Sequence, residues 1–226
     1  MEGQVIYNSN CVSETIIMNN KTKFIVFEGI DGAGKTTQIN LLKNALEKRG
    51  IPCMTTAEPT AFPSGREIRD ALAGRTNKTA LEMAEMFARD RIIHNNHPEE
   101  GINVSLDRGI SVISDRYYYS SLAYQGAALG YGTVAALNLD VDDIRTPDIC
   151  IFLDLTPEKS LERIGKRGEA TEIYENFEYL TKTRKMFFDT FDKLKARGEK
   201  IAIIDASGSP QEIGERILCE VLKIYE

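Results

Sequence analysis

The chain has 226 residues, of which 42% are hydrophobic and 27% are charged, and its formal net charge is −6. This hydrophobic content is too high for a disordered chain, and the length suffices for one globular domain with a full core. The negative charge argues against a nucleic-acid-binding protein, which needs a basic surface. No stretch approaches the roughly 18 uncharged apolar residues of a membrane-spanning helix.

The cysteines and histidines show no pattern of a metal site or a disulfide framework. None of the cysteines forms a CxxC pair, so we expect reduced thiols in a cytoplasmic protein. The two histidines, His94 and His97, are too few and too close together to complete a zinc site with these cysteines. The cysteines are Cys11, Cys53, Cys150 and Cys219.

The beginning of the chain differs from the rest. Residues 1–20 carry only two charged side chains, Glu2 and Glu14, and contain neither arginine nor a basic segment followed by an apolar one. This composition argues against a signal peptide and against a mitochondrial presequence. We therefore expect a flexible N-terminal arm over residues 1–21 and a single domain over residues 22–226.

Five short apolar runs follow, separated by segments with helical spacing. The runs are continuous rather than alternating, which is typical of parallel strands covered on both faces. Strand–helix alternation of this kind predicts an α/β fold, with a five-stranded parallel sheet flanked by helices on both faces. The predicted strands cover residues 24–27, 51–56, 110–113, 149–155 and 201–204.

Two helices have ends that can be read from the sequence. Apolar residues at helical spacing over residues 39–46 are followed by Gly50, in a position where glycine ends a helix. Near the C-terminus, Ser209 is a predicted N-cap, with Pro210 in the first turn and Glu212 completing a capping box.

A phosphate-binding motif follows the first predicted strand. Residues 29–36 read GIDGAGKT and fit the pattern GxxxxGK[ST], between an apolar strand and an amphipathic helix. Glycines let successive backbone N–H groups turn toward an anion, and the helix N-terminus adds a partial positive charge. The lysine of this motif reaches the β- and γ-phosphates, so we expect Lys35 to be catalytic. The predicted ATP-binding residues are Gly29, Ile30, Asp31, Gly32, Ala33, Gly34, Lys35, Thr36 and Thr37.

An acidic and a basic residue follow the third predicted strand. A carboxylate at a strand end beside a P-loop can hold the metal, so we expect Asp115 and the Thr36 hydroxyl to bind Mg²⁺. Arg116 offers a planar fork for a second phosphate. The Asn-Lys-x-Asp run with which GTPases read guanine is absent from the sequence. A P-loop alone does not distinguish the remaining classes of ATP-binding protein.

The sequence around these residues resembles the thymidylate kinase family. Residues 115–125, DRYYYSSLAYQ, are similar to its pattern DR[YH]xxSxxAYQ. Four further segments agree in order, and the resemblance extends from about residue 23 to the C-terminus. TAEP at 56–59 resembles TREP, FARDR at 87–91 resembles FxxxR, LDLTPE at 153–158 resembles LDxxPE, and 204–207 matches IDAS.

This resemblance implies a P-loop kinase with a three-layer fold that transfers a phosphoryl group from Mg-ATP to dTMP, giving ADP and dTDP for dTTP biosynthesis. A monophosphate oxygen is already anionic at neutral pH, so no general base is needed. This agrees with the expectation that the two histidines, which could serve as general bases, lie away from the motifs. Catalysis then depends on in-line positioning and on neutralising the migrating charge. The predicted catalytic residues are Lys35, Asp115, Arg116, Arg163 and Arg167.

The resemblance also implies the acceptor site. Phe87 would stack on the pyrimidine, and Arg91, one helical turn later, would donate to its O4. Asp31 would accept from the 3′-hydroxyl, Arg116 would hold the acceptor phosphate, and the Tyr124 ring would crowd the 2′ position of a ribonucleotide. The implied dTMP-binding residues are Asp31, Glu58, Phe87, Arg91, Arg116, Ser120, Tyr124 and Gln125.

One position departs from the family pattern. Where the resembled segment has Arg before Glu-Pro, this chain has Ala57, which removes a cation near the acceptor site. Arg66 or Arg69 could replace it, and Glu58 remains as a metal or water contact. The difference leaves open a related kinase with another acceptor, such as UMP or dUMP, because one methyl group discriminates only about tenfold.

A basic segment with two glycines is expected to form a lid over residues 162–175. Arg163, Lys166 and Arg167 fall within five residues there. Such a segment is typical either of a solvated helix end or of a lid that brings arginine to the transferring phosphoryl. The variable P-loop positions hold no basic residue, so the chain resembles family members with a lid arginine. We expect Arg167, and after it Arg163, in this role.

A third interpretation is an ATP-binding domain without turnover. The intact Lys35, Thr36, Asp115 and Arg116 argue against it. The thymidylate kinase resemblance implies ATP as co-substrate, Mg²⁺, small-molecule partners only, and a cytoplasmic homodimer packed through helices.

Overall fold

A computed structural model describes residues 22–166 and 177–226 of the chain. Five parallel strands form one sheet in the order β2-β3-β1-β4-β5. All five predicted strands are confirmed, and their ends differ from the prediction by at most two residues. The strands are β1 (Phe24–Glu28), β2 (Cys53–Ala57), β3 (Ser111–Asp115), β4 (Ile149–Asp154) and β5 (Ile201–Asp205).

The described residues also form helices of very different lengths. α1 and α10 are the helices whose ends were predicted, whereas α2 and the short α4, α6 and α7 were not predicted. The helices are α1 (Lys35–Glu47), α2 (Pro63–Leu72), α3 (Ala80–Asn96), α4 (Ile102–Asp107), α5 (Tyr118–Tyr124), α6 (Gly126–Leu129), α7 (Tyr131–Asn138), α8 (Pro157–Lys166), α9 (Phe177–Ala196) and α10 (Pro210–Leu222).

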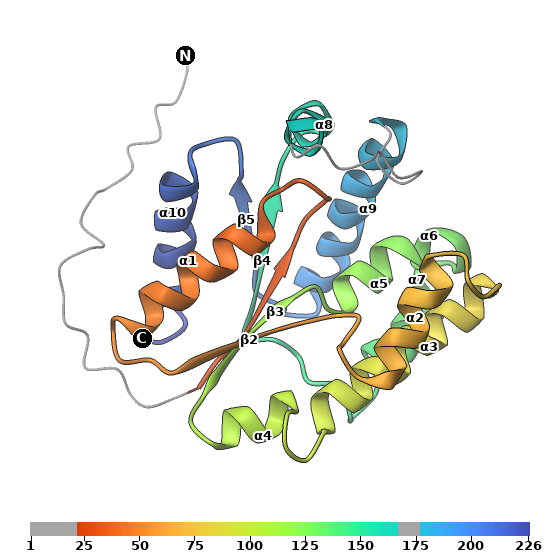
Figure 1. The fold of residues 1–226 in the computed structure, drawn as a ribbon, viewed down its shortest axis with the longest axis horizontal. Helices are drawn as coiled ribbons and strands as arrows, with labels where there is room; N and C mark the ends of the chain where they lie inside the picture. Colours follow the sequence, from red (N-terminus) through yellow and green to blue (C-terminus); the bar gives the residue numbers. More distant parts are fainter. Residues whose placement is uncertain (1–21, 167–176) are drawn as a thin grey trace.

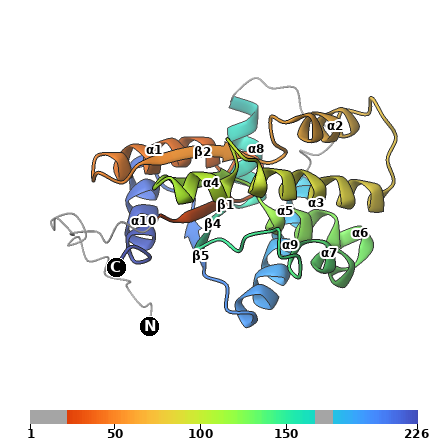
Figure 2. The same cartoon turned by 90° about the horizontal axis from the view of Figure 1, so that it is seen from below.

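Helices cover both faces of the sheet (Figure 1). α1 and α10 pack on one face, where Leu46 and Ile217 meet Ile151 in a continuous apolar core. α4, α5 and α9 pack on the other face, where Phe152 lies against Phe187. Helices α3, α5, α6 and α7 lie together on the side away from α1 and α10 (Figure 2). The α/β fold with a doubly covered parallel sheet is therefore confirmed.

Burial along the strands follows their place in the sheet. β1 is buried throughout, and β3 and β4 are buried except at their last residue. The prediction of continuous burial is wrong for β2 and β5, which alternate or lie partly exposed. Both are edge strands with a neighbour on one side only, so the helices cover them incompletely.

Both predicted helix ends are confirmed. Gly50 follows α1 with φ +76°, a left-handed value that favours glycine. At the start of α10, Ser209 and Glu212 form the reciprocal bonds of a capping box. The predicted arm and the greater part of the predicted lid lie outside the described residues. Within the described ranges, no helix has the length and apolar character needed to cross a membrane.

Candidate active site

The loop between β1 and α1 presents backbone N–H groups at the carboxyl end of the sheet. Gly32 and Gly34 have φ values of +76° and +96°, which glycine adopts without a steric penalty. Gly34 is the N-cap of α1, and no side chain caps this helix. The N–H groups of its first turn, which contains the exposed Thr36 and Thr37, are thus free to meet an anion.

Lys35 lies within this phosphate cradle. Its Nζ donates to the Gly29 carbonyl at 3.1 Å and lies 4.0 Å from Asp31 Oδ1. Burial, together with repulsion from Arg116, lowers the pKa of Lys35 from 10.5 to about 8. A bound phosphate would add negative charge beside the ammonium and so favour its charged form.

Arg116 faces the P-loop from the carboxyl end of β3. Its Nη2 donates to Asp31 Oδ1 at 2.5 Å, and its Nη1 donates to Ser120 Oγ at 3.2 Å. Among the described residues, Arg116 alone combines a side chain with a positive φ, +68°. This left-handed conformation costs about 1 kcal/mol. Such strain occurs preferentially at functional sites.

Asp115 has the properties of a metal-binding carboxylate. Its Oδ1 is buried and finds no hydrogen-bond partner in the described part of the chain, which is costly unless a donor or cation is supplied. No group of three or more His, Cys, Asp or Glu side chains that could hold a metal occurs among the described residues. Mg²⁺ often takes one carboxylate plus substrate phosphates, so Asp115 and the Thr36 hydroxyl fit this ion.

Glu28 fixes the start of α5. Its Oε1 accepts from the backbone N–H groups of Tyr117 at 3.0 Å and Ser120 at 3.1 Å, and its Oε2 accepts from Ser120 Oγ at 2.7 Å. Burial raises the pKa of Glu28 from 4.5 to about 7, although the charges of Arg116 and Lys35 oppose the rise. Glu28 was not among the predicted site residues; the available signal was a carboxylate closing an otherwise apolar strand.

Arg91 lies in a second, buried polar network. Its Nε and Nη2 donate to Glu58 Oε2 at 2.9 and 2.6 Å, and Nη2 also donates to Ser121 Oγ at 3.2 Å. Nη1 donates to Asn138 Oδ1, and the Tyr117 ring lies 5.1 Å from the guanidinium carbon. These bonds use four of the five N–H donors of an arginine. The fifth N–H, on Nη1, makes no hydrogen bond within the described part of the chain.

The remaining predicted acceptor residues lie on α3 and α5. Phe87 is half-buried one turn before Arg91. The Tyr124 ring packs edge-on against Phe187 at 5.9 Å and lies 5.8 Å from the Arg116 guanidinium. Gln125 is the C-cap of α5. Contacts thus join Asp31, Arg116, Ser120 and Tyr124 in one group, and Glu58 and Arg91 in another.

Arg163 connects the predicted lid to the P-loop. From α8, its Nη1 donates to the Ala33 carbonyl at 3.3 Å and its Nη2 to the Ala206 carbonyl at 2.8 Å. Ser160 Oγ, on the same helix, donates to the Asp31 carbonyl. The N-terminal part of the lid therefore contacts the phosphate cradle directly. Arg167, the other predicted lid arginine, lies outside the described residues.

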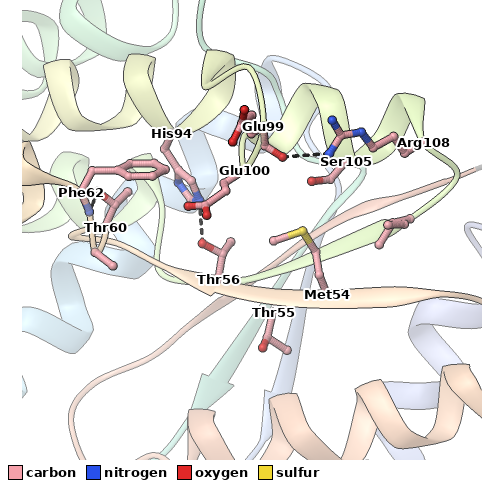
Figure 3. Close-up of a pocket in the computed structure, with 12 residues that line it drawn as sticks. Met54, Thr55, Thr56, Thr60, Phe62, His94, Glu99, Glu100, Ser105 and Arg108 are labelled. Carbon is pink, nitrogen blue, oxygen red and sulfur yellow. Dashed lines mark hydrogen bonds between the residues drawn. The ribbon is translucent and has the colours of Figure 1, made fainter.

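A cavity of about 380 Å³ lies between β2, α3 and α4 (Figure 3). Its lining includes Thr56, Phe62, His94 and Arg108, and it contains none of the predicted site residues. The cavity is therefore adjacent to the acceptor network rather than part of the phosphate cradle.

Comparison with known proteins identifies the family. The thymidylate kinase family model matches residues 27–217. A thymidylate kinase of Desulfotalea psychrophila is 38% identical over 177 residues, covering 75% of this chain and 82% of that protein. Another, from Leptospira borgpetersenii, is 36% identical over 199 residues, covering 88% and 92%. The chain belongs to the thymidylate kinase family. The resemblance that the motifs indicated is confirmed, as is the assignment to an enzyme family.

One interpretation of the histidines in this thymidylate kinase family member needs correction. His94 does not lie away from the motifs, because its Nδ1 is 3.0 Å from Glu58 Oε1. Both oxygens of Glu58 have protein partners, His94 and Arg91. Glu58 therefore belongs to the acceptor network, and its role as a metal or water contact stays a prediction. Sequence spacing alone could not show the contact between His94 and Glu58, since the two residues are 36 positions apart.

The segment that departs from the family pattern is held by Arg69. Its Nη1 donates to the Pro59 carbonyl at 2.9 Å and to the Thr60 carbonyl at 2.8 Å. The guanidinium thus lies beside the turn that follows Ala57, whereas Arg66 is exposed on α2. Of the two arginines considered as replacements for the missing cation, Arg69 is the one in contact with this turn.

Proposed function

We propose that this chain transfers the γ-phosphoryl group of ATP to dTMP, giving ADP and dTDP. Membership of the thymidylate kinase family supports the reaction, and one observation in the site supports it independently. Arg116 and Lys35, two cations suited to phosphates, both lie beside Asp31 at the carboxyl ends of β1 and β3. A donor phosphate in the P-loop and an acceptor phosphate on Arg116 would then face each other across Asp31.

The residues of this chain act mainly by positioning and by charge. The P-loop N–H groups and Lys35 hold the β- and γ-phosphates, and Arg116 orients the acceptor phosphate for in-line attack. Mg²⁺, held by Asp115 and Thr36, would neutralise charge on the phosphates. The acceptor oxygen needs no general base because it is already anionic. Catalysis therefore comes from placing cations where charge develops.

The acceptor base is recognised, in this proposal, by Phe87 and Arg91. The half-buried ring stacks on the pyrimidine, and the remaining Nη1 N–H donates to its O4. When the acceptor binds, Asp31 exchanges its bond to Arg116 for the 3′-hydroxyl, and Arg116 turns to the phosphate. Tyr124, beside Arg116, crowds the 2′ position.

The deciding experiment is ADP release from Mg-ATP with dTMP, dUMP, UMP, CMP, GMP and thymidine as acceptors. We expect a strong preference for dTMP. Comparable turnover of UMP or dUMP would favour the related kinase that Ala57 leaves open. Comparable turnover of UMP, which has a 2′-hydroxyl, would also remove Tyr124 as the ribose filter. ATP binding without turnover of any acceptor would refute the kinase proposal.

The proposal includes a homodimer in the cytoplasm. Leu72 is 48% exposed and Leu81 is 45% exposed, on the neighbouring helices α2 and α3. Exposed apolar side chains on adjacent helices are typical of subunit interfaces. The absence of CxxC spacing in the sequence favours the cytoplasmic location. Light scattering after size-exclusion chromatography tests the dimer; a monomeric mass at working concentrations would contradict it.

A further inference from the structure

A buried series of hydrogen bonds leads from β2 to Arg91. Thr56 Oγ1 and His94 Nε2 are 2.7 Å apart, and His94 Nδ1 is 3.0 Å from Glu58 Oε1. The other oxygen of Glu58 accepts two N–H groups of Arg91. The side chains of His94, Glu58 and Arg91 are each at most 2% exposed. These three side chains are therefore shielded from bulk water in the intact protein, although Thr56 and His94 also line the neighbouring cavity.

His94 determines which way the Glu58 carboxylate faces. A carboxylate only accepts, so Nδ1 of His94 donates to Oε1; the Nε2 of a neutral ring then accepts from the Thr56 hydroxyl. Because both ring nitrogens are engaged, the imidazole cannot turn without losing a bond. Oε1 is thereby held, and Oε2 is directed at the guanidinium of Arg91.

We propose that His94 is a positioning residue for recognition of the acceptor base. His94 holds Glu58, and Glu58 holds the guanidinium plane of Arg91, so that the N–H left on Nη1 meets the base carbonyl. Supporting groups of this kind orient the residues that touch a ligand without touching it themselves. The inference rests on the proposed function, in which Arg91 contacts the base.

The cavity beside His94 provides a direct test. Thr56 and His94 face each other in the lining of this cavity of about 380 Å³, with Phe62 on one side of the pair and Met54 and Arg108 on the other (Figure 3). Truncating His94 to Ala would join the volume of the imidazole to this space. Free imidazole could then enter and meet the same two partners, Thr56 and Glu58.

The experiment compares steady-state kinetics of four variants with those of the wild type. His94→Leu fills the space but forms no hydrogen bond, His94→Asn keeps an amide at the position of Nδ1, and His94→Ala leaves the space open. His97→Ala is the matched control, since His97 stacks on Phe62 at 4.6 Å and makes no described contact with Glu58. KM for dTMP, KM for ATP and kcat are measured for each protein.

We expect His94→Leu to raise KM for dTMP about tenfold, the effect of losing one hydrogen bond to a charged group. Its kcat and its KM for ATP should change less than about twofold, because the phosphate cradle is not part of this network. His94→Asn should stay within about threefold of the wild type in KM for dTMP. His97→Ala should match the wild type.

Imidazole separates positioning from a general loss of folding. Added imidazole should lower KM for dTMP in His94→Ala toward the wild-type value and leave His94→Leu unchanged. An unaltered KM for dTMP in His94→Leu would overturn the proposal. So would a His94→Ala protein that loses kcat and both affinities together and does not respond to imidazole. A wild type that does not phosphorylate dTMP would instead refute the proposed function, before any variant is compared.

Discussion

Glu28→Gln tests how much the fold is destabilised by ionising a carboxylate beneath the active site. Gln has nearly the same shape as Glu. Its amide oxygen can accept from the backbone N–H groups of Tyr117 and Ser120, while its amide nitrogen faces Ser120 Oγ. The substitution therefore removes the titrating charge and keeps the packing.

The magnitude follows from the difference in proton affinity between the folded and unfolded states. Burial raises the pKa of Glu28 from 4.5 to about 7, so the folded protein binds this proton more tightly. The stabilisation from the group is thus complete below pH 4.5 and is lost as pH rises through about 7. At about 1.4 kcal/mol per tenfold change in affinity, the wild type should lose about 2 kcal/mol relative to Glu28→Gln between about pH 5 and about pH 7.5.

Urea denaturation of both proteins across this pH range, without ligands, measures the effect. The charged groups that face Glu28 are Arg116 and Lys35. The range ends below the Lys35 pKa of about 8, so that Lys35 stays mainly charged throughout. The free energy of unfolding of the wild type should fall relative to that of Glu28→Gln as pH rises. Two curves with a constant separation would refute the reasoning.

Four further predictions concern catalysis, specificity and stability. Arg167→Ala should lower kcat about 100-fold with little change in dTMP affinity, because a contact made in the transition state affects turnover. Arg163→Ala should lower kcat less. An unchanged kcat in Arg167→Ala would remove Arg167 from the lid role. Phe87→Ala should raise KM for dTMP about tenfold through lost stacking, and an unaltered KM would contradict this. Tyr124→Ala should narrow the preference for dTMP over its ribonucleotide, as measured by the ratio of kcat/KM values; equal selectivity would exclude the ring as a filter. Phe187→Ala, at a side chain with no exposed surface, should lower the free energy of unfolding by about 4 kcal/mol, which a denaturant titration can check.

Local patterns predicted the framework of the fold. Apolar runs located the three central strands because these are covered on both faces. Apolar runs also located the two edge strands, but they predicted a continuous burial that these strands do not have. The GxxxxGK[ST] pattern located the cradle because its glycine positions are set by the backbone conformation itself, as at Gly32 and Gly34. The burial of edge strands and the positions of short helices were harder to predict, because they depend on residues that are distant in the sequence.

The support of the site was not predictable from spacing. Glu28 meets Ser120 across 92 positions, and His94 meets Glu58 across 36. Sequence motifs name the residues that face the substrate, such as Arg91 and Arg116. They do not name the carboxylate or imidazole behind each one, because those contacts exist only once distant strands and helices have packed together.

At position 116, the left-handed backbone favours glycine, whereas the contacts of the site require a side chain. Glycine would adopt φ +68° without the cost of about 1 kcal/mol, so the fold alone would accept or even favour it. Glycine, however, would lose the hydrogen bonds that the Arg116 side chain makes to Asp31 and Ser120. In a library of random variants selected for expression or melting temperature, Arg116→Gly should therefore be retained. In the same library selected for growth that depends on the enzyme's activity, Arg116→Gly should be lost. Stability engineering of this protein should leave position 116 untouched.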